Sequence, residues 1–343
     1  MTSEFASILG RLVSDPVVDP DDVRAAFDAI LAGTWTPVQV GAFAVALRVR
    51  GETPEIIVAA AQALRAVMTP VEHNLPVVVD TCGTGGDGSH TLNLSSAAAV
   101  VVASCGVPVG KHGNRSASSR CGSADVFEVL GIPLDLPADR QGEVLSEAGI
   151  AFLFAQAHHP ALRHAAQARR ELGSRTIFNA LGPLANPARA THQLMGVYDD
   201  ALRPIAARAL RDLGCRRAWV VRSVDGLDEV SPCAETRVSE LVESREVGER
   251  VVAPEDFGIE RIDRSAIAGA DPQTNARAIS DILAGGEHPA RPAVVLNAAA
   301  MLAVVTGDPL PRCADRARQA LDNRSAANTL DRWRRVANRV RPQ

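Results

Sequence analysis

The sequence has little lysine, little aromatic character and little net charge. Among its 343 residues, 3% are aromatic, and the formal charge is -4. A balance this close to neutral argues against a protein that grips nucleic acid with a basic face, so an anionic ligand must be held by local groups. The hydrophobic content of 46% is enough to bury a sizeable core. The length suggests about two domains, or one large α/β domain with a helical appendage.

The sequence also lacks paired cysteines and long hydrophobic runs. Its six cysteines form no CxxC pair and have no regular spacing, which is typical of free thiols in a reducing compartment and argues against structural zinc. The most apolar stretch, from Ala97 to Val109, is well short of the ~20 residues that span a bilayer. The first residues show no signal-peptide pattern. We therefore expect a cytoplasmic protein with no membrane segment.

Apolar residues recur at helical spacing through the first 70 residues. This pattern predicts a helical domain over residues 1–70, too small to stand alone. At Leu75–Thr81 the sequence changes to LPVVVDT, a β-branched run typical of a buried parallel strand. Strand character returns, between alanine-rich helical segments, at Ala151–Phe154, Ala218–Arg222 and Ala293–Leu296. The alternation predicts an α/β domain over residues 71–343 with a mostly parallel sheet, and the charged segment 240–264 is expected to be a solvated excursion.

A glycine-rich loop with nearby hydroxyl groups follows the first predicted strand. It runs from Asp80 to Gly88 as DTCGTGGDG and leads through Thr91–Ser96 into a helix of small residues. Glycines allow positive φ angles and let backbone N–H groups approach a ligand, and a loop before a helix N-terminus suits anions. The Walker A pattern is absent, since no Gly-Lys-Ser/Thr closes the loop. The glycines alone could form a tight strand-to-helix turn, but the hydroxyl and amide groups favour a binding site.

A second polar segment, Gly110–Asp125, reads GKHGNRSASSRCGSAD. It carries three cations and four hydroxyl groups, which are the features of a flexible loop that closes over phosphates. Lys111 is the only lysine among the 36 basic residues of the chain. We expect this lysine to lie on the loop, near substrate phosphates, although a solvated basic loop is the alternative interpretation.

These segments together resemble the signature of the anthranilate phosphoribosyltransferases. The resemblance covers essentially the whole chain, and it rests on motifs that occur in order at Gly83–Asp87, Asn93–Ser96, Lys111–Asp125, Arg169–Pro187 and Asp225–Val230. It implies the fold of the pyrimidine nucleoside phosphorylases, in which helices near residues 160–190 return to the small helical domain beside a large α/β domain. It also implies transfer of the phosphoribosyl group of phosphoribosyl pyrophosphate (PRPP) to the amine of anthranilate in tryptophan biosynthesis.

The resemblance further implies Mg²⁺ as cofactor and a set of site residues, matched position by position. The residues matched to the PRPP site are Gly83, Gly86, Asp87, Thr91, Asn93, Leu94, Ser95, Ser96, Lys111, His112, Gly113, Asn114, Arg115, Ser116, Ala117, Ser118, Ser119 and Ser123. Those matched to Mg²⁺ are Ser95, Asp228 and Glu229, and those matched to anthranilate are Gly83, Asn114 and Arg169. Oxygen ligands suit Mg²⁺, and an arginine fork fits a carboxylate.

No residue has the character of a strong general base, and none is required. The anthranilate amine is neutral at pH 7, so positioning the substrates and stabilising the departing pyrophosphate would supply most of the rate. His112 is the acid–base candidate by residue type, with a structural or phosphate-contact role favoured. His158, His159 and His164 suggest a metal cluster, but a pair at a helix start beside proline is the simpler interpretation.

The resemblance also implies a homodimer formed by the helical domain, for which Leu9, Leu12, Phe43 and Leu47 provide apolar stripes. Departures from the family pattern, at Cys121, Ser96 and His90, remove no metal carboxylate.

Two other functions stay open at this point. A pyrimidine nucleoside phosphorylase shares the fold and the glycine loop but binds inorganic phosphate and a nucleoside, whereas KHGNRSASS and RTIFN favour the transferase. A relative that binds nucleic acid would have a basic surface and eroded carboxylates, whereas this chain is acidic and keeps Asp228 and Glu229.

Overall fold

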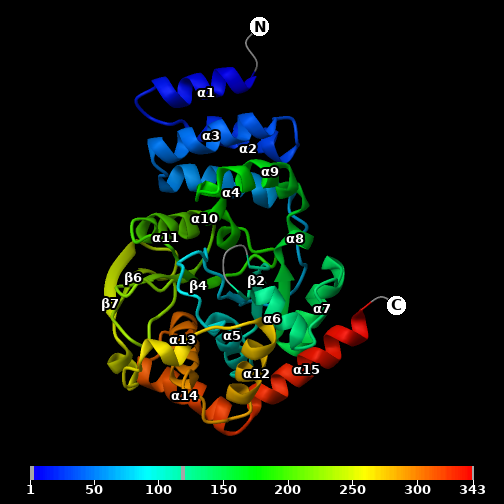
Figure 1. Cartoon of the computed structure of the whole chain (residues 1–343), viewed down its shortest axis with the longest axis vertical. Coiled ribbons are helices and arrows are strands. Elements are labelled where there is room, and N and C mark those ends of the chain that lie inside the picture. Colours follow the sequence, from blue (N-terminus) through cyan, green and yellow to red (C-terminus); the bar gives the residue numbers. More distant parts are fainter. Residues whose placement is uncertain (1–3, 117–119, 342–343) are drawn as a thin grey trace.

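The computed structural model describes residues 4–116 and 120–341. A bundle of helices stands at one end of the molecule, above a larger α/β part (Figure 1), and it begins with α1 (Glu4–Ser14), α2 (Pro20–Leu31), α3 (Pro37–Arg50) and α4 (Pro54–Val67). The side chains of Asp19, Thr36 and Thr53 accept hydrogen bonds from N–H groups in the first turns of α2, α3 and α4. Each of these caps is followed by proline, whose φ is already helical, so the starts of these helices are set locally.

Within residues 4–116 and 120–341, seven strands form one sheet in the order β3-β2-β1-β4-β5-β6-β7. Their bounds are β1 (Val79–Asp80), β2 (Val109–Gly113), β3 (Ile150–Phe154), β4 (His192–Gly196), β5 (Arg217–Ser223), β6 (Thr236–Leu241) and β7 (Val247–Val252). The first five pair in parallel, and β6 and β7 extend one edge in antiparallel fashion. The predicted α/β class with a mostly parallel sheet is confirmed.

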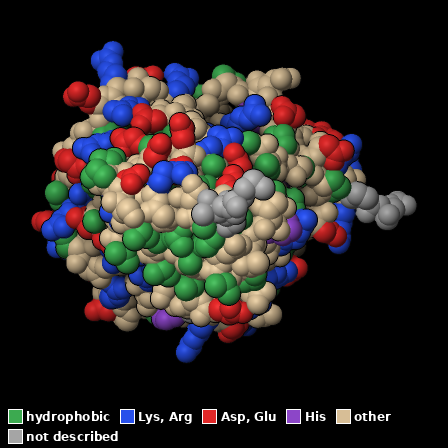
Figure 2. Space-filling view, turned by 90° about the horizontal axis from the view of Figure 1, so that it is seen from above, with side chains coloured by type: hydrophobic (Ala, Val, Ile, Leu, Met, Phe, Trp, Pro, Cys, Tyr) green, Lys and Arg blue, Asp and Glu red, His purple; other side chains and the backbone are tan. Residues whose placement is uncertain are grey.

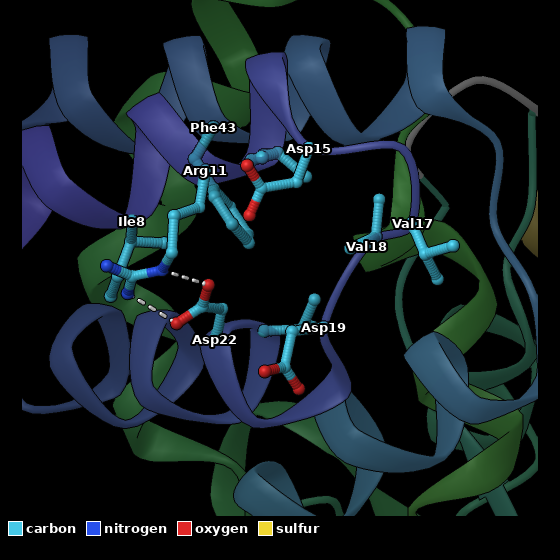
Figure 3. Close-up of a pocket in the computed structure, with 10 residues that line it drawn as sticks. Ile8, Arg11, Asp15, Val17, Val18, Asp19, Asp22 and Phe43 are labelled. Atoms are coloured by element: carbon cyan, nitrogen blue, oxygen red, sulfur yellow. Dashed lines mark hydrogen bonds and ion pairs between the residues drawn. The ribbon is translucent and has the colours of Figure 1, made fainter.

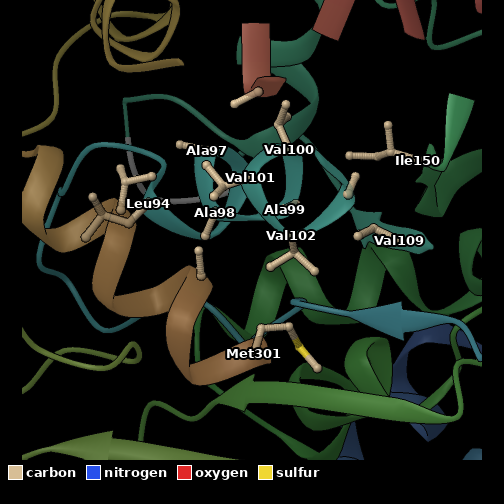
Figure 4. Packing of buried hydrophobic residues seen from close by; sticks show 14 of the residues in the cluster. Leu94, Ala97, Ala98, Ala99, Val100, Val101, Val102, Val109, Ile150 and Met301 are labelled. Atoms are coloured by element: carbon tan, nitrogen blue, oxygen red, sulfur yellow. The ribbon is translucent and has the colours of Figure 1, made fainter. Parts of the chain in front are cut away.

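Two hydrophobic cores lie on opposite faces of the sheet. Along β4 and β5, Leu194 and Trp219 belong to one core, and their neighbours Met195 and Val220 belong to the other. The first core is centred on α5 (Leu94–Ser104), which packs against α13 (Arg291–Thr306) (Figure 4). The helices and turns of the α/β part that complete the fold are α6 (Ser123–Val129), α7 (Ala138–Ala148), α11 (Leu202–Asp212), α12 (Pro272–Leu283), α14 (Leu310–Asp322), α15 (Ser325–Val340), η2 (Pro254–Phe257) and η3 (Arg264–Ile267).

The second core joins the helical bundle to the other face of the sheet. After β3 the chain forms α8 (Ala155–His158), η1 (Pro160–Leu162), α9 (Arg163–Leu172) and α10 (Ile177–Leu184). Helix α9 packs on α2 and α3, and α10 packs on α3 and α4 (Figure 1). Phe178 of α10 meets Phe27 of α2 at a ring distance of 5.2 Å. The bundle therefore shares its core with elements from the middle of the chain, which carry Arg169.

Several strand expectations were wrong. Ala293–Leu296 lies inside the 16-residue helix α13, whose middle is buried on all sides, so its continuous apolar run imitates a buried strand. The run Leu75–Thr81 forms a strand only at Val79–Asp80. Within the segment 240–264, expected to be a solvated excursion, β7 is largely exposed. However, β7 pairs with β6, so this part of the segment extends the sheet and is not a loop.

The apolar stripes expected at a dimer interface point inward. Leu12, Phe43 and Leu47 are fully buried in the helical bundle of a single chain, and only Leu9 is half-buried. The residues expected to be exposed therefore stabilise the bundle itself. Among the described residues, no helix is long and apolar enough to cross a membrane.

Candidate active site

The glycine loop lies at the carboxyl ends of β1 and β4, where the strand order reverses. In parallel sheets this crevice is the usual place for a ligand. Gly83 lies so close to the end of β4 that a methyl group there would be 2.9 Å from the Gly196 carbonyl oxygen. The N–H of Thr84 donates to the same oxygen at 2.9 Å. Gly86 has a φ of +76°, so a residue with a side chain would be strained there.

The polar residues after the loop surround the N-terminus of α5. Leu94 is buried, and Asn93, which precedes the helix, makes no capping bond with its side chain. Its Nδ2 donates to the Cys121 carbonyl at 3.1 Å, and its Oδ1 accepts from Nδ2 of Asn275 at 3.0 Å. Thr91 forms a bridge with Ala268. The loop is thus held from outside, by the segment that leads into α12.

Carboxylates gather opposite the helix N-terminus. The N–H of Ser95 donates to Oε1 of Glu229 at 3.1 Å, and the N–H of Asp228 donates to Oδ2 of Asp87 at 3.4 Å. Among the described residues, the buried Oε2 of Glu229 has no hydrogen-bond partner. Desolvation, reinforced by Asp87, raises the pKa of Asp228, and desolvation, reinforced by Asp228, raises the pKa of Glu229. Carboxylates that repel one another around an unpartnered oxygen fit a cation.

Lys111 is not on a flexible loop, contrary to the expectation from sequence. It lies in β2, and its side chain is 2% exposed. The ammonium donates to the carbonyl and hydroxyl oxygens of Thr81 at 3.3 and 3.1 Å and to Oγ of Ser95 at 3.4 Å. Burial lowers its pKa. The polar sequence around Lys111 imitates a loop, but pairing of β2 with β1 and β3 places the charge beneath the site.

Beside Lys111, a buried network joins β1, β2 and α10. Oδ1 of Asp80 accepts the N–H groups of Cys82 and His112, and Oδ2 accepts Nδ2 of Asn186 at 2.7 Å. Burial raises the pKa of Asp80 to about 6. Nδ1 of His112 lies 2.9 Å from the Gly182 carbonyl, and burial holds its pKa well below the usual range. Asp80, Cys82 and His112 are close enough to share a metal, but the carboxylate oxygens and Nδ1 already have these partners.

The segment after β2 leaves the sheet at Asn114. Oγ of Ser123 donates to the Asn114 carbonyl at 3.3 Å, and the N–H of Ser116 donates to Asp125 at 3.3 Å. Arg115 is exposed and pairs with Asp125 and Glu128. The predicted site residues Ala117, Ser118 and Ser119 lie outside the described residues.

Arg169 lies on α9, above the ring of Phe178 at 5.7 Å. Among residues 4–116 and 120–341, no carboxylate is within ion-pair distance of its guanidinium, and desolvation lowers its pKa. A half-buried arginine without an acidic partner is suited to the carboxylate of a ligand. The segment between β3 and α9 also contacts residues at the end of β2. Gln156 donates to Oδ1 of Asn114 at 3.4 Å. The rings of His112 and His159 are 5.0 Å apart.

Among the described residues, the histidines that suggested a metal cluster, His158, His159 and His164, do not form a group close enough to share a metal. Nδ1 of His158 lies 2.9 Å from the Thr69 carbonyl, and burial lowers the pKa of His159 to about 4. A separate cavity of about 10 Å³ lies between α1 and α2, where Arg11 pairs with Asp22 (Figure 3), and it belongs to the bundle rather than to the site.

Sequence reasoning assigned no role to Asp80, Arg175, Asn186 or Asn275, which all contact this region. Arg175 and Asn186 stand inside a motif that carried the resemblance, and Asp80 begins the glycine-rich segment, so their positions were a usable signal. Asn275 has no local signal, because its partner Asn93 is 182 residues away.

Comparison with known proteins agrees with this architecture. The model of a "Glycosyl transferase family, helical bundle domain" matches residues 6–68, and that of a "Glycosyl transferase family, a/b domain" matches residues 75–327. An anthranilate phosphoribosyltransferase of Myxococcus xanthus is 47% identical over 94% of this chain and 96% of its own length. One of Thermomicrobium roseum is 47% identical over 97% of both chains.

Solved structures give the same result. The anthranilate phosphoribosyltransferase of Thermus thermophilus superposes with a TM-score of 0.91 at 39% identity, covering 96% of this chain and 99% of that one. The enzyme of Saccharomyces cerevisiae in complex with PRPP and Mg has a TM-score of 0.92 at 26% identity, covering 99% of both. This chain belongs to the anthranilate phosphoribosyltransferase family.

Proposed function

We propose that this protein transfers the phosphoribosyl group of PRPP to the amine of anthranilate, with release of pyrophosphate, as a step of tryptophan biosynthesis. The observation that carries the proposal is the meeting, at one edge of the sheet, of a glycine loop, a helix N-terminus and a carboxylate cluster. The Saccharomyces cerevisiae structures are complexes with PRPP and Mg and with 4-fluoroanthranilate, two ligands of the kinds this reaction needs.

PRPP is held by the residues matched to it in the sequence. The glycine loop lies beside the N-terminus of α5, and the partial positive charge of that helix N-terminus attracts phosphate. Lys111 acts from beneath, through Ser95, as a fixed positive charge.

Mg²⁺ is held by Ser95, Asp228 and Glu229, whose oxygen donors and mutual repulsion fit a hard cation. When bound, the ion neutralises charge on the departing pyrophosphate. Asp87 keeps the segment in place by accepting the Asp228 N–H.

Arg169 holds the carboxylate of anthranilate, and Asn114 and Gly83 lie near the amine of anthranilate. We assign no general base, and His112 is buried with Nδ1 engaged by a carbonyl. The chain therefore acts by positioning the amine against C1 of the ribose and by stabilising the leaving group.

The deciding experiment follows the loss of anthranilate fluorescence with and without PRPP and Mg²⁺. We expect turnover only with all three, and Glu229→Gln is expected to need more Mg²⁺ for half-maximal turnover, because an anionic ligand is lost while the bond from the Ser95 N–H is kept. Phosphorolysis of thymidine or uridine without anthranilate turnover would instead identify a nucleoside phosphorylase.

We also propose that the protein is cytoplasmic, that its helical domain spans residues 1–70 and its α/β domain 71–343, and that it is a homodimer. The surface that supports a dimer is a stripe on α3 formed by Val38, Ala42, Val45 and Val49, spaced by four, three and four residues. Val38 and Val49 are both 81% exposed. Figure 2 looks onto the bundle, where apolar side chains gather on the visible face.

A further inference from the structure

Arg175 stands against the glycine loop although it is far from it in the sequence. It lies between Gly173, the left-handed end of α9, and Thr176, whose N–H donates to Oδ1 of Asn179 at 3.0 Å to begin α10. The backbone on either side of Arg175 is therefore fixed. A methyl group at Gly86 would lie 3.4 Å from Nε and 3.5 Å from Nη2 of Arg175, so the guanidinium runs alongside the loop.

The ring of Tyr198, whose backbone is hydrogen-bonded to the glycine loop, orients this guanidinium. Arg175 stacks over Tyr198 at 4.6 Å, in the geometry of a cation–π contact. The N–H of Tyr198 donates to Oγ1 of Thr84 at 3.0 Å, and the N–H of Thr84 donates to Gly196. The ring and the glycine loop are thus held as one unit, and the cation is placed relative to both.

The charge of Arg175 has no acidic partner. Within residues 4–116 and 120–341, no carboxylate lies within ion-pair distance of its guanidinium, and no hydrogen bond is made by it. Arg115 and Arg264, by contrast, are paired with carboxylates. Arg175 is also exposed, so its donors are open to a ligand.

We propose that Arg175 is a further binding residue for PRPP and contacts the oxygens of its pyrophosphate group. The pyrophosphate is favoured because Gly86 directly precedes Asp87, which is bonded to the segment carrying the Mg²⁺ carboxylates. The planar guanidinium, placed over the Tyr198 ring, carries several N–H donors, which suit phosphate oxygens. The proposal rests on the proposed function, since it deepens the role of the same site.

The test measures binding of inorganic pyrophosphate with Mg²⁺ by calorimetry, together with the KM values for PRPP and anthranilate. In Arg175→Ala we expect pyrophosphate binding weaker by roughly 10- to 100-fold, as for loss of a charge-assisted contact, and a raised KM for PRPP with an unchanged KM for anthranilate. Arg175→Lys is expected to recover part of the binding, because it keeps the charge without the fork.

Arg170→Ala is the matched control, because it removes an exposed arginine five residues away on α9 and is expected to behave as wild type. Unchanged pyrophosphate binding in Arg175→Ala, or equal weakening of both KM values, would overturn the proposal. Calorimetry needs no turnover, so a wild type that binds pyrophosphate but does not consume anthranilate would refute the proposed function and leave the Arg175 result readable.

Discussion

At the scale of single residues, the burial of Lys111 shows how the fold places a charge beside the candidate site. Lys111 is the only lysine of the chain, and it lies on a strand, where its ammonium contacts Thr81 and Ser95. A buried ammonium needs such partners because desolvation is costly. A compact point charge with three donors can satisfy three oxygens at once, which the flat guanidinium of arginine cannot do in the same space.

Burial of Lys111 leads to a prediction about its reactivity. An amine-selective acylating reagent is expected to modify the N-terminal amine of the folded protein but to spare Lys111, which is 2% exposed, even without substrate. Unfolding in guanidinium should make both amines react, and a peptide map measures each. Rapid acylation of Lys111 in the folded protein would contradict the strand assignment.

A second residue-scale prediction concerns acid. Burial lowers the pKa of His192, in the central strand β4, to about 4, against about 6.5 in an unfolded chain. Between these values the unfolded state binds more protons, so the free energy of unfolding falls as the pH drops from 6.5 towards 4. At about pH 4.5 the expected loss from this histidine is roughly 2 to 3 kcal/mol.

The variant His192→Asn removes the titration and can still form a hydrogen bond with Thr191, whose Oγ1 lies 2.8 Å from Nδ1 of the ring. Denaturant unfolding at about pH 7.5 and about pH 4.5 should show a smaller loss for the variant than for the wild type. An equal loss in both proteins would show that other groups cause the acid sensitivity.

At the scale of elements, helices remote in sequence hold the site loops. Asn297 of α13 accepts the N–H of Val230 at 3.1 Å and donates to its carbonyl at 3.0 Å, which secures the segment next to Glu229. On α12, Asn275 accepts the Ala270 N–H at 2.8 Å and donates to Asn93. Helices from the C-terminal third of the chain thus hold the segments around the candidate site in place.

Asn275→Asp tests this support. Aspartate can still accept from the Ala270 N–H but cannot donate to Asn93, so we expect a raised KM for PRPP and a stability loss of about 1–3 kcal/mol. Val336→Ala in α15 is the control. It truncates a buried side chain away from the site, so it should lower stability but leave the KM for PRPP unchanged. Equal KM values in wild type and Asn275→Asp would show that α12 serves stability alone.

At the scale of the whole molecule, the helical bundle packs with the helix that carries Arg169 and provides the surface that we propose for assembly. Helices α9, which carries Arg169, and α10 pack against α2, α3 and α4 of the bundle, while α3 keeps exposed valines. A contiguous exposed apolar stripe is a usual mark of an interface. Both roles depend on the same four N-terminal helices.

Val45→Asp is expected to convert a dimer into a monomer, because an isologous interface would bury the new carboxylate twice. Sedimentation equilibrium at micromolar concentration measures the outcome. The control Val129→Asp changes a valine of α6 with nearly the same exposure, 43% against 46%, and should leave the assembly unchanged. A monomeric wild type would contradict the proposed dimer.

Local chemistry was readable from the sequence. The helical spacing over the first 70 residues, the strand runs at Ala151–Phe154 and Ala218–Arg222, and the glycine loop are all visible in short stretches of sequence. For the same reason the order of the motifs was enough to indicate the family, since each motif is a short run of residues whose chemistry is set by its own composition.

The tertiary structure decided everything that depends on which surfaces are covered. A continuous apolar run at Ala293–Leu296 is compatible with a strand or a helix buried on all sides, and only packing against α5 selects the helix. Lys111 is drawn into a strand by pairing with β1 and β3, and α9 and α10 return from the middle of the chain to pack on α3, the helix that carries Phe43. These outcomes come from contacts between segments far apart in the chain, whose burial no local pattern records.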